Sequence, residues 1–265
     1  MAGVRSWLFA PGHSDRVLRR AFDVDADAVL LDLEDSVPAE QKRKARDQVR
    51  EVLASHPEAW VRINRPRDAF AEADLAAVGG RCAGVRIPKV ASEADVEWVA
   101  ERLEGVPLTC TVESALGVTR AFEIASHPRT RDLVIGTADL ALDLGIEAGW
   151  EETVFARSAL VIASRAAGKG APIDGAHAQI DDLDGLRRAA ESARRLGYFG
   201  KSAIHPRQVA VINEVFRPTA TELEWARRVL DAFERAGRAA TRLEDGELVD
   251  VPIAERARRI LETAP

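Results

Sequence analysis

Two acidic residues follow short apolar runs of the kind that form buried strands. Glu113 comes directly after 108–112, and Asp139 lies just past Gly136, at the end of the run 133–135. The two acids are 26 residues apart, about the length of one strand-plus-helix unit, so neighbouring parallel strands would bring them together. Two hard oxygen ligands without a nearby His or Cys suit Mg²⁺. Acids also cap helix N-termini, and the residues alone leave both interpretations open.

A third acidic group follows the second apolar run, in the sequence LDLEDSVP. It contains Asp32, Glu34 and Asp35. On the same barrel face as the other two acids, this group would bind metal-bound waters or orient Lys and Arg side chains. The alternative is a solvated loop in which Asp35 or Ser36 caps the helix that begins near Pro38. Taken by itself, the group favours the solvated loop.

Basic residues occur in or after other apolar runs. Arg62 lies within WVRIN, where its guanidinium would suit bidentate binding of a carboxylate, although a lone strand Arg more often snorkels or pairs locally. Lys89 in RIPK and Lys201 in GKSAIHP are analogous basic residues at strand ends. His205, before Pro206, is interpreted as a helix cap slightly in preference to a ligand contact.

Short apolar runs alternate with longer amphipathic segments along most of the chain. Eight strand-plus-helix units follow one another, and eight such units close naturally into a (β/α)₈ TIM barrel. The predicted fold class is therefore α/β, a barrel with additional C-terminal helices, and the second choice is an open doubly wound sheet. The predicted strands are 6–10, 28–34, 59–64, 83–90, 108–112, 133–137, 170–174 and 200–204.

The last part of the chain exceeds what a barrel needs. We predict a catalytic barrel domain over 1–216 and a helical extension over 217–265 that packs on the barrel or on a neighbouring subunit. The extension contains an amphipathic helix over 218–237, a turn over 245–250 and a final helix from 251.

Composition narrows the possible partners and compartment. The net charge of -6 argues against a general nucleic-acid binder. Cys82 and Cys110 have no CxxC spacing, which argues against a disulfide framework or a zinc site. The N-terminus lacks the features of a signal peptide, and no apolar run reaches the roughly 20 residues that span a bilayer. We expect a protein of the reducing cytoplasm with small-molecule partners.

Eight motifs in order resemble the CitE-like branch of the HpcH/HpaI aldolase family, which contains citrate lyase β subunits and malyl-CoA lyases. The motifs are RSWLFAPG, AVLLDLEDSVP, VRIN, IPKV, the turn in ESALGV, GTADLALDLG, GKSAIHPRQ and DGELVDVPIAERA, which together cover nearly the whole chain. One departure is ESALG, which stands where many members of the family have Thr after the Glu.

The resemblance implies an enzyme that cleaves or forms a carbon–carbon bond between a 2-oxo acid and an acyl thioester. It implies a divalent metal, Mg²⁺, held by Glu113 and Asp139, and a substrate contact from Arg62. The thioester would be carried by CoA or by an acyl-carrier protein, and the assembly would be a homotrimer or a dimer of trimers. Glu34 and Asp35 are counted with the catalytic residues.

The resemblance also assigns an acid/base role to Asp250, supplied by the neighbouring subunit. From the residues alone, Asp250 is more simply interpreted as a cap of the helix that begins at Val251 and Pro252.

Substrate and CoA contacts are the least constrained part, because no Walker-type or GxGxxG loop is present. Arg5, Arg16 and Lys201 are basic groups that would meet a pyrophosphate or a carboxylate. The predicted substrate- or CoA-binding residues are Arg62, Arg5, Lys201, His205, Gly136 and Thr137.

The leading hypothesis is a Mg²⁺-dependent lyase that acts on a citryl-CoA-like or malyl-CoA-like thioester. The alternatives are an aldolase on a free hydroxy-dicarboxylate and a subunit or scaffold that depends on carrier and transferase partners. Retention of Glu113, Asp139, Arg62 and Asp250 together argues against a degenerate scaffold.

Overall fold

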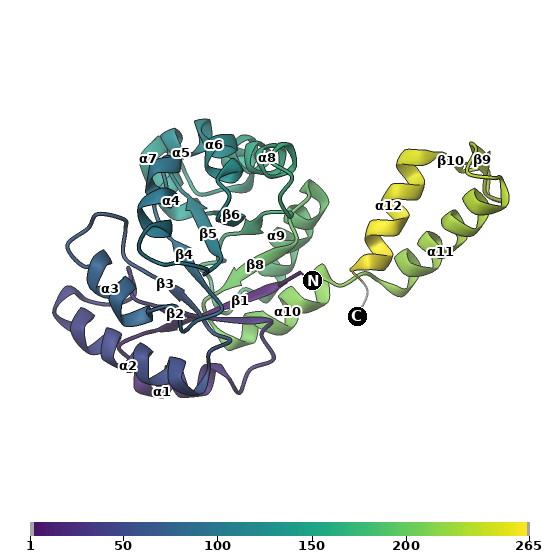
Figure 1. The fold of residues 1–265 in the computed structure, drawn as a ribbon. Coiled ribbons are helices and arrows are strands. Elements are labelled where there is room, and N and C mark those ends of the chain that lie inside the picture. Colours follow the sequence, from purple (N-terminus) through teal and green to yellow (C-terminus); the bar gives the residue numbers. More distant parts are fainter. Residues whose placement is uncertain (1–2, 264–265) are drawn as a thin grey trace. The chain divides into compact units, whose positions relative to one another are not determined.

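Eight parallel strands form a closed barrel in the computed structural model, which describes residues 3–263 (Figure 1). Each strand pairs with the next in the sequence, and β8 returns to β1. The predicted (β/α)₈ barrel is confirmed, and the open sheet is not observed. The strands are β1 (Ser6–Pro11), β2 (Ala28–Asp32), β3 (Trp60–Arg62), β4 (Gly84–Ile87), β5 (Leu108–Val112), β6 (Thr130–Ile135), β7 (Ile173–Asp174) and β8 (Gly200–Ala203).

Helices surround the barrel and begin and end where local sequence favours it. Ser92 and Asp95 form a capping box at the start of α4, and Gly197 ends α9 in the left-handed region with φ 112°. The helices are α1 (Asp15–Ala21), the 3₁₀ helix η1 (Ala39–Gln41), α2 (Lys42–Ser55), α3 (Ala71–Val78), α4 (Glu93–Ala100), α5 (Ala115–Thr119), α6 (Ala121–Ser126), α7 (Thr137–Leu144), α8 (Trp150–Ala166), α9 (Leu183–Leu196) and α10 (Pro206–Phe216).

Aromatic side chains fill the N-terminal end of the barrel. Trp7 and Trp60 pack edge to face, with ring centroids 4.9 Å apart. Gly84 makes this possible, because a Cβ at this position would lie 2.1 Å from the Trp60 ring. Ala28, Leu30, Val134 and Ile173 complete the same buried cluster. These residues close the barrel below the site.

The C-terminal strand ends meet at the opposite rim, since all eight strands run parallel. Asp32 is the last residue of β2, Glu113 directly follows β5, and Gly136 directly follows β6. Loops at this end of a TIM barrel carry ligand-binding residues. The candidate acids from three separate parts of the chain therefore share one rim.

The chain divides into two compact units, one spanning 4–213 and the other formed chiefly by the segment from Glu214 onward. In the second unit, α11 (Ala220–Arg235) and α12 (Val251–Glu262) bury a core that includes Val229, Phe233 and Val249. Between them, β9 (Thr241–Arg242) and β10 (Leu248–Val249) form an antiparallel hairpin. Sequence analysis predicted the turn but missed these two-residue strands.

Across residues 3–263, no helix combines the length and the apolar character that crossing a membrane requires.

Candidate active site

A cleft of about 210 Å³ opens among residues of the barrel rim and interior. It brings together the predicted residues Arg62, Glu113, Gly136, Thr137 and Asp139. Its full lining is Phe9, Arg62, Arg86, Thr111, Glu113, Val134, Ile135, Gly136, Thr137, Ala138, Asp139, Gly175, Ala176, Ala178, Ser202 and Ile204.

Glu113 is held tightly at this rim. Its Oε1 accepts a hydrogen bond of 2.6 Å from the Lys89 amide, and its side chain is buried. Gly136 lies so close that a Cβ there would be 2.0 Å from Oε2 and 2.7 Å from the Glu113 Cβ. A larger residue at position 136 would therefore displace the carboxylate.

Burial raises the pKa of Glu113 to about 8, and repulsion from the carboxylates of Glu34 and Asp139 adds to the increase. A divalent cation beside this group would favour its charged form. Ser114, not Glu113, caps α5, because its hydroxyl accepts from the Gly117 amide. The helix-cap alternative for Glu113 is therefore not what the structure contains.

Asp139 lies in the first turn of α7, whose N-cap is Gly136. Within residues 3–263, no group of three or more His, Cys, Asp and Glu side chains is arranged to bind a metal. A metal site in this cleft would therefore use Glu113 and Asp139 as its protein ligands. Two carboxylates fit Mg²⁺, which commonly takes one or two protein carboxylates and completes its shell with water and substrate oxygens.

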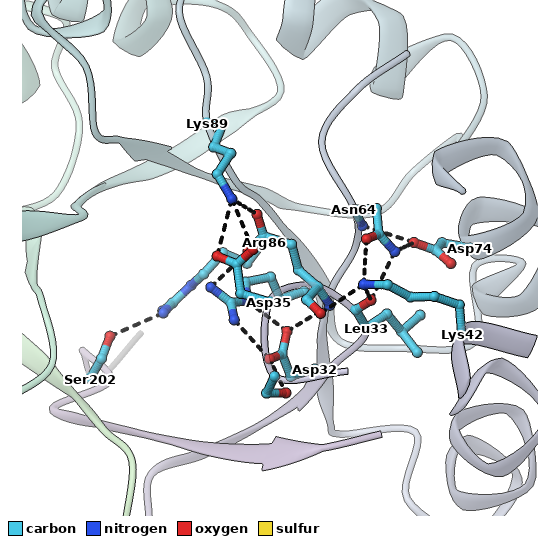
Figure 2. A network of polar contacts seen from close by, with 12 residues as sticks. Asp32, Leu33, Asp35, Lys42, Asn64, Asp74, Arg86, Lys89 and Ser202 are labelled. Atoms are coloured by element: carbon cyan, nitrogen blue, oxygen red, sulfur yellow. Dashed lines mark hydrogen bonds and ion pairs between the residues drawn. The ribbon is translucent and has the colours of Figure 1, made fainter. Parts of the chain in front are cut away.

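The acidic group after β2 forms a network of ion pairs with Arg62 and Lys89. Arg62 donates to both Asp32 oxygens, at 2.6 and 2.7 Å, and its Nη1 lies 2.8 Å from Glu34 Oε2. Lys89 Nζ contacts Glu34 at 2.5 Å and Asp35 at 3.0 Å (Figure 2). Asp32 and Glu34 are buried, and only Asp35 is exposed. The solvated-loop interpretation is therefore wrong for Asp32 and Glu34, and this group orients the two cations.

The network changes the pKa values of its members in opposite directions. Burial alone would raise the pKa of Asp32, but the Arg62 guanidinium outweighs it and the net pKa is lowered. For Glu34, burial dominates over Arg62 and Lys89, so its pKa is raised. Burial would lower the pKa of Lys89, whereas its hydrogen bond and charge contact with Glu34 raise it.

Lys89 adopts a backbone conformation that L-residues rarely take, with φ 52°. This turn directs its amide to Glu113 and leaves its ammonium group to reach Glu34 and Asp35. One residue thus links the carboxylates that follow β2 with the carboxylate that follows β5. Uncommon backbone conformations are often retained at functional sites.

A buried network outside the cleft fixes the loop that carries Glu34. Lys42 Nζ donates to the carbonyls of Leu33 and Glu34 and to Asn64 Oδ1, each at 2.7 Å. Asn64 in turn donates to Asp74 at 2.6 Å (Figure 2). Sequence analysis missed this network, because Lys42 occurs in a run of charged residues typical of an exposed helix.

Arg86 is the main cleft residue that sequence analysis missed. It lies on β4 in register with Arg62, its side chain is buried, and its guanidinium packs over Trp7 at 4.6 Å. The available signal was a charged residue in the middle of the apolar run AGVRIPKV, the same signal that identified Arg62.

Two predicted basic residues are not brought to the cleft. Lys201 is buried in an ion pair of 2.5 Å with Asp174, on the side of β8 opposite to Ser202. Arg5 forms a two-pronged ion pair with Asp27, with both distances 2.8 Å, and it precedes β1 at the end of the barrel away from the rim.

Two further predicted residues make local capping contacts. His205 Nδ1 accepts from the Arg207 amide at 3.2 Å at the start of α10, which agrees with the cap interpretation. Asp250 is the N-cap of α12 and accepts from the Ile253 amide at 3.2 Å. Asp250 belongs to the second unit, and its assigned acid/base role stays a prediction.

The barrel and its rim define a class of protein, a TIM-barrel enzyme with paired carboxylates and buried guanidiniums at one small cleft. Comparison with known families identifies it further. The family model of the HpcH/HpaI aldolase/citrate lyase family matches residues 5–206. The chain belongs to this family, and the predicted enzyme class, a lyase similar to the citrate lyase beta subunit, is confirmed.

Relatives cover nearly the full chain. A (3S)-malyl-CoA thioesterase from Cereibacter sphaeroides is 38% identical, over 98% of this chain and 94% of the relative. The citrate lyase subunit beta of Escherichia coli is 34% identical, over 98% and 93%. The crystal structure of CitE from Mycobacterium tuberculosis in complex with magnesium, acetoacetate and coenzyme A matches with a TM-score of 0.87 and 33% identity, covering 99% of this chain and 98% of that one.

Proposed function

We propose that the protein is a Mg²⁺-dependent carbon–carbon lyase that acts on a β-hydroxyacyl thioester. Cleavage would give a 2-oxo acid and an acyl thioester, and the reverse reaction would join them. The observation that carries the proposal is the convergence of Glu113, Asp139 and Arg62 on one cleft of about 210 Å³. A crystal structure of the related CitE contains magnesium, acetoacetate and coenzyme A, which supports the same ligand classes here.

The residues of the cleft have distinct roles in this chemistry. Glu113 and Asp139 would hold Mg²⁺, which supplies Lewis-acid polarisation of the oxo-acid oxygens when bound. Arg62 stabilises negative charge as it develops on a substrate oxygen. Glu34 and Asp35 act as positioning residues, because their ion pairs orient Arg62 and Lys89.

Proton transfer completes the reaction. In the cleavage direction the acid/base group takes the proton of the substrate hydroxyl, the hydroxyl carbon becomes the carbonyl of the oxo acid, and the electron pair of the broken carbon–carbon bond forms the enolate of the acyl thioester. The enolate carbon then takes a proton. We assign this step to Asp250 of a neighbouring subunit, following the family resemblance.

This function implies particular partners. We propose a small 2-oxo acid and an acyl-CoA as ligands, with an acyl-carrier protein as the alternative carrier, and a homotrimer or a dimer of trimers as the assembly. The cytoplasm remains the predicted compartment, in line with two buried free cysteines.

A second candidate is thioester hydrolysis, which the similarity to the (3S)-malyl-CoA thioesterase favours. Hydrolysis would add water to malyl-CoA and give malate and free CoA. The lyase reaction would instead give glyoxylate and acetyl-CoA. The products therefore distinguish the two reactions.

The direct test is to incubate the purified protein and Mg²⁺ with citryl-CoA, malyl-CoA, methylmalyl-CoA and 3-hydroxy-3-methylglutaryl-CoA. We expect an oxo acid and an acyl-CoA in a metal-dependent reaction. Cleavage of free malate-type acids, with no cleavage of their CoA esters, would favour the free-acid aldolase. Absence of thioester cleavage, together with unchanged Mg²⁺ affinity in Glu113→Ala, would refute the proposal.

The role of Asp250 has a separate test. Mixing inactive Asp250→Ala chains with inactive Glu113→Ala chains should restore activity if one site takes residues from two subunits. No recovery after confirmed subunit exchange would count against a shared site. The helix-cap contact of Asp250 makes Asp250→Asn the matched variant, because Asn also caps helices.

A further inference from the structure

Arg86 is a buried cation with unused hydrogen-bond donors. Its side chain is only 1% exposed, and one nitrogen, Nη1, donates to Ser202 Oγ at 3.1 Å (Figure 2). Across residues 3–263, Nε and Nη2 have no hydrogen-bond partner, and Arg86 takes part in no ion pair. By contrast, Arg62 on the neighbouring strand β3 forms ion pairs with two carboxylates, those of Asp32 and Glu34.

Such an arrangement is unfavourable unless a ligand completes it, because a buried charge and unpaired donors both lose hydration. The Trp7 and Phe9 rings lie 4.6 and 5.7 Å from the guanidinium and offset part of that loss. They provide no acceptor in the plane of the guanidinium. Burial and the neighbouring Arg62 lower the pKa of Arg86 to about 9, so the group stays positively charged at neutral pH.

Arg86 forms the floor of the cleft, whereas the two carboxylates lie at its rim. On the adjacent strand, Arg86 is in register with Thr109, four residues before Glu113, so the backbone of Arg86 lies deeper in the barrel than that of Glu113. The guanidinium also lies over Trp7, which belongs to the aromatic cluster at the barrel bottom. A ligand held at the rim reaches Arg86 only with a group that points into the barrel.

The lining of this cleft contains a second unused polar group. Thr111 lines the cleft, and its buried hydroxyl has no hydrogen-bond partner among the described residues. A guanidinium edge and a free hydroxyl together suit a carboxylate, which accepts from both.

We propose that Arg86 binds a second carboxylate of the substrate and thereby selects a 2-oxo dicarboxylate over glyoxylate or pyruvate as the oxo-acid half. This inference rests on the proposed lyase function and names the substrate class of the same site. The cleft of about 210 Å³ is smaller than sites for drug-sized ligands, so the bulky CoA portion extends outward through the mouth. The group that reaches the floor therefore belongs to the small oxo-acid half.

Binding of two stable acids tests the proposal without any turnover. Malate and lactate are both 2-hydroxy acids, and malate differs from lactate only in a carboxylate on the methyl carbon. Calorimetric titration in saturating Mg²⁺ should show that the unaltered protein binds malate at least about tenfold more tightly than lactate. This ratio corresponds to one charge-assisted hydrogen bond. Equal affinities would overturn the proposal.

Variants locate the preference on Arg86. Arg86→Met should weaken malate binding to the level of lactate and leave lactate affinity unchanged, whereas Arg86→Lys should retain part of the preference. Arg102→Met is the matched control, because Arg102 also packs over a tryptophan, Trp98 at 4.1 Å, on the outer surface. It should bind both acids as the unaltered protein does.

The remaining outcomes are also decisive. If Arg86→Met still prefers malate, the preference depends on another residue. If the Met variant does not fold, a full malate preference in Arg86→Lys leads to the same conclusion. If neither acid binds in Mg²⁺ and no thioester is cleaved, the lyase function itself fails. If lactate binds as well as malate while thioesters are cleaved, only the role of Arg86 fails.

Discussion

The tripeptide Val-Arg-Ile occurs twice, at the end of β3 and in β4, and its two arginines have different electrostatic surroundings. Arg62 and Arg86 are in register on β3 and β4, and both guanidiniums lie against Phe9. Arg62 meets Asp32 and Glu34, supplied by the preceding strand β2 and the residues after it. Arg86 finds the neutral hydroxyl of Ser202 across the barrel.

The difference separates two regions of the rim. Around β2 and β3 the chain pairs its own charges, so Arg62 is already held by carboxylates before a substrate binds. Around β4 to β6 it leaves Arg86, Glu113 and Asp139 without a partner of opposite charge in an ion pair among residues 3–263. We infer that the second region gains its missing partners from a cation and an anionic substrate.

The largest expected effect is a loss of stability when Arg62, in the region around β2 and β3, is replaced. Arg62→Met would leave Asp32 and Glu34 buried without their main cation, and breaking a buried pair costs about 3–5 kcal/mol. Urea unfolding followed by tryptophan fluorescence measures this loss. A change below about 1 kcal/mol would show that this region does not depend on Arg62.

The next largest effect is expected on Mg²⁺ affinity when charge is removed from the region around β4 to β6. Glu113→Gln keeps an acceptor for the Lys89 amide but removes the negative charge, so we expect Mg²⁺ affinity to fall by at least about 100-fold with little change in fold. Glu101→Gln, an exposed carboxylate, is the control. Unchanged Mg²⁺ affinity in Glu113→Gln would remove Glu113 from the metal site.

A smaller effect is expected from moving the same carboxylate. The Cβ of Gly136→Ala would overlap the Glu113 side chain, and a displacement of this kind should weaken Mg²⁺ binding by about 10- to 100-fold. Gly149→Ala is matched, because Gly149 also caps a helix and its Cβ would meet only the end of the exposed Glu152. Equal Mg²⁺ affinities in both variants would contradict the proposed contact.

The raised pKa of Glu113 sets a pH dependence. Since metal binding requires the carboxylate form, Mg²⁺ affinity should rise about tenfold per pH unit up to about pH 8 and then level off. Without metal, the folded chain holds a proton that the unfolded chain releases. This group's contribution to stability should therefore fall as pH rises from the ordinary carboxyl range to about 8. Both trends should be absent in Glu113→Gln.

The smallest expected effect is on stability when Arg86 is replaced. Arg86→Met removes a buried cation that no carboxylate neutralises, so the free energy of unfolding should change by no more than about 1 kcal/mol, or increase. The contrast with Arg62→Met, measured in the same urea titration, tests the comparison directly. A loss of about 3 kcal/mol or more would mean that Arg86 has a structural role.

Much of the fold could be predicted from the sequence, because the signals are local. Most strands of the barrel contain a short apolar run, and alternation of these runs with amphipathic segments predicted the eight units and their order. The acids Glu113 and Asp139 were found in the same way, by their position after such runs. The hairpin of β9 and β10 was missed, since two-residue strands carry no periodic pattern.

What the tertiary structure alone decided is how the charges are paired. Lys201 and Arg86 are both buried strand residues, yet Lys201 faces Asp174 and Arg86 faces the cleft, because the two sides of a strand point to different surroundings. The partners are also far apart in sequence, with 30 positions between Arg62 and Asp32 and 116 between Arg86 and Ser202. The local sequence pattern indicates whether a residue is buried. Which group meets it depends on closure of the barrel, and that closure leaves Arg62 paired and Arg86 available to a ligand.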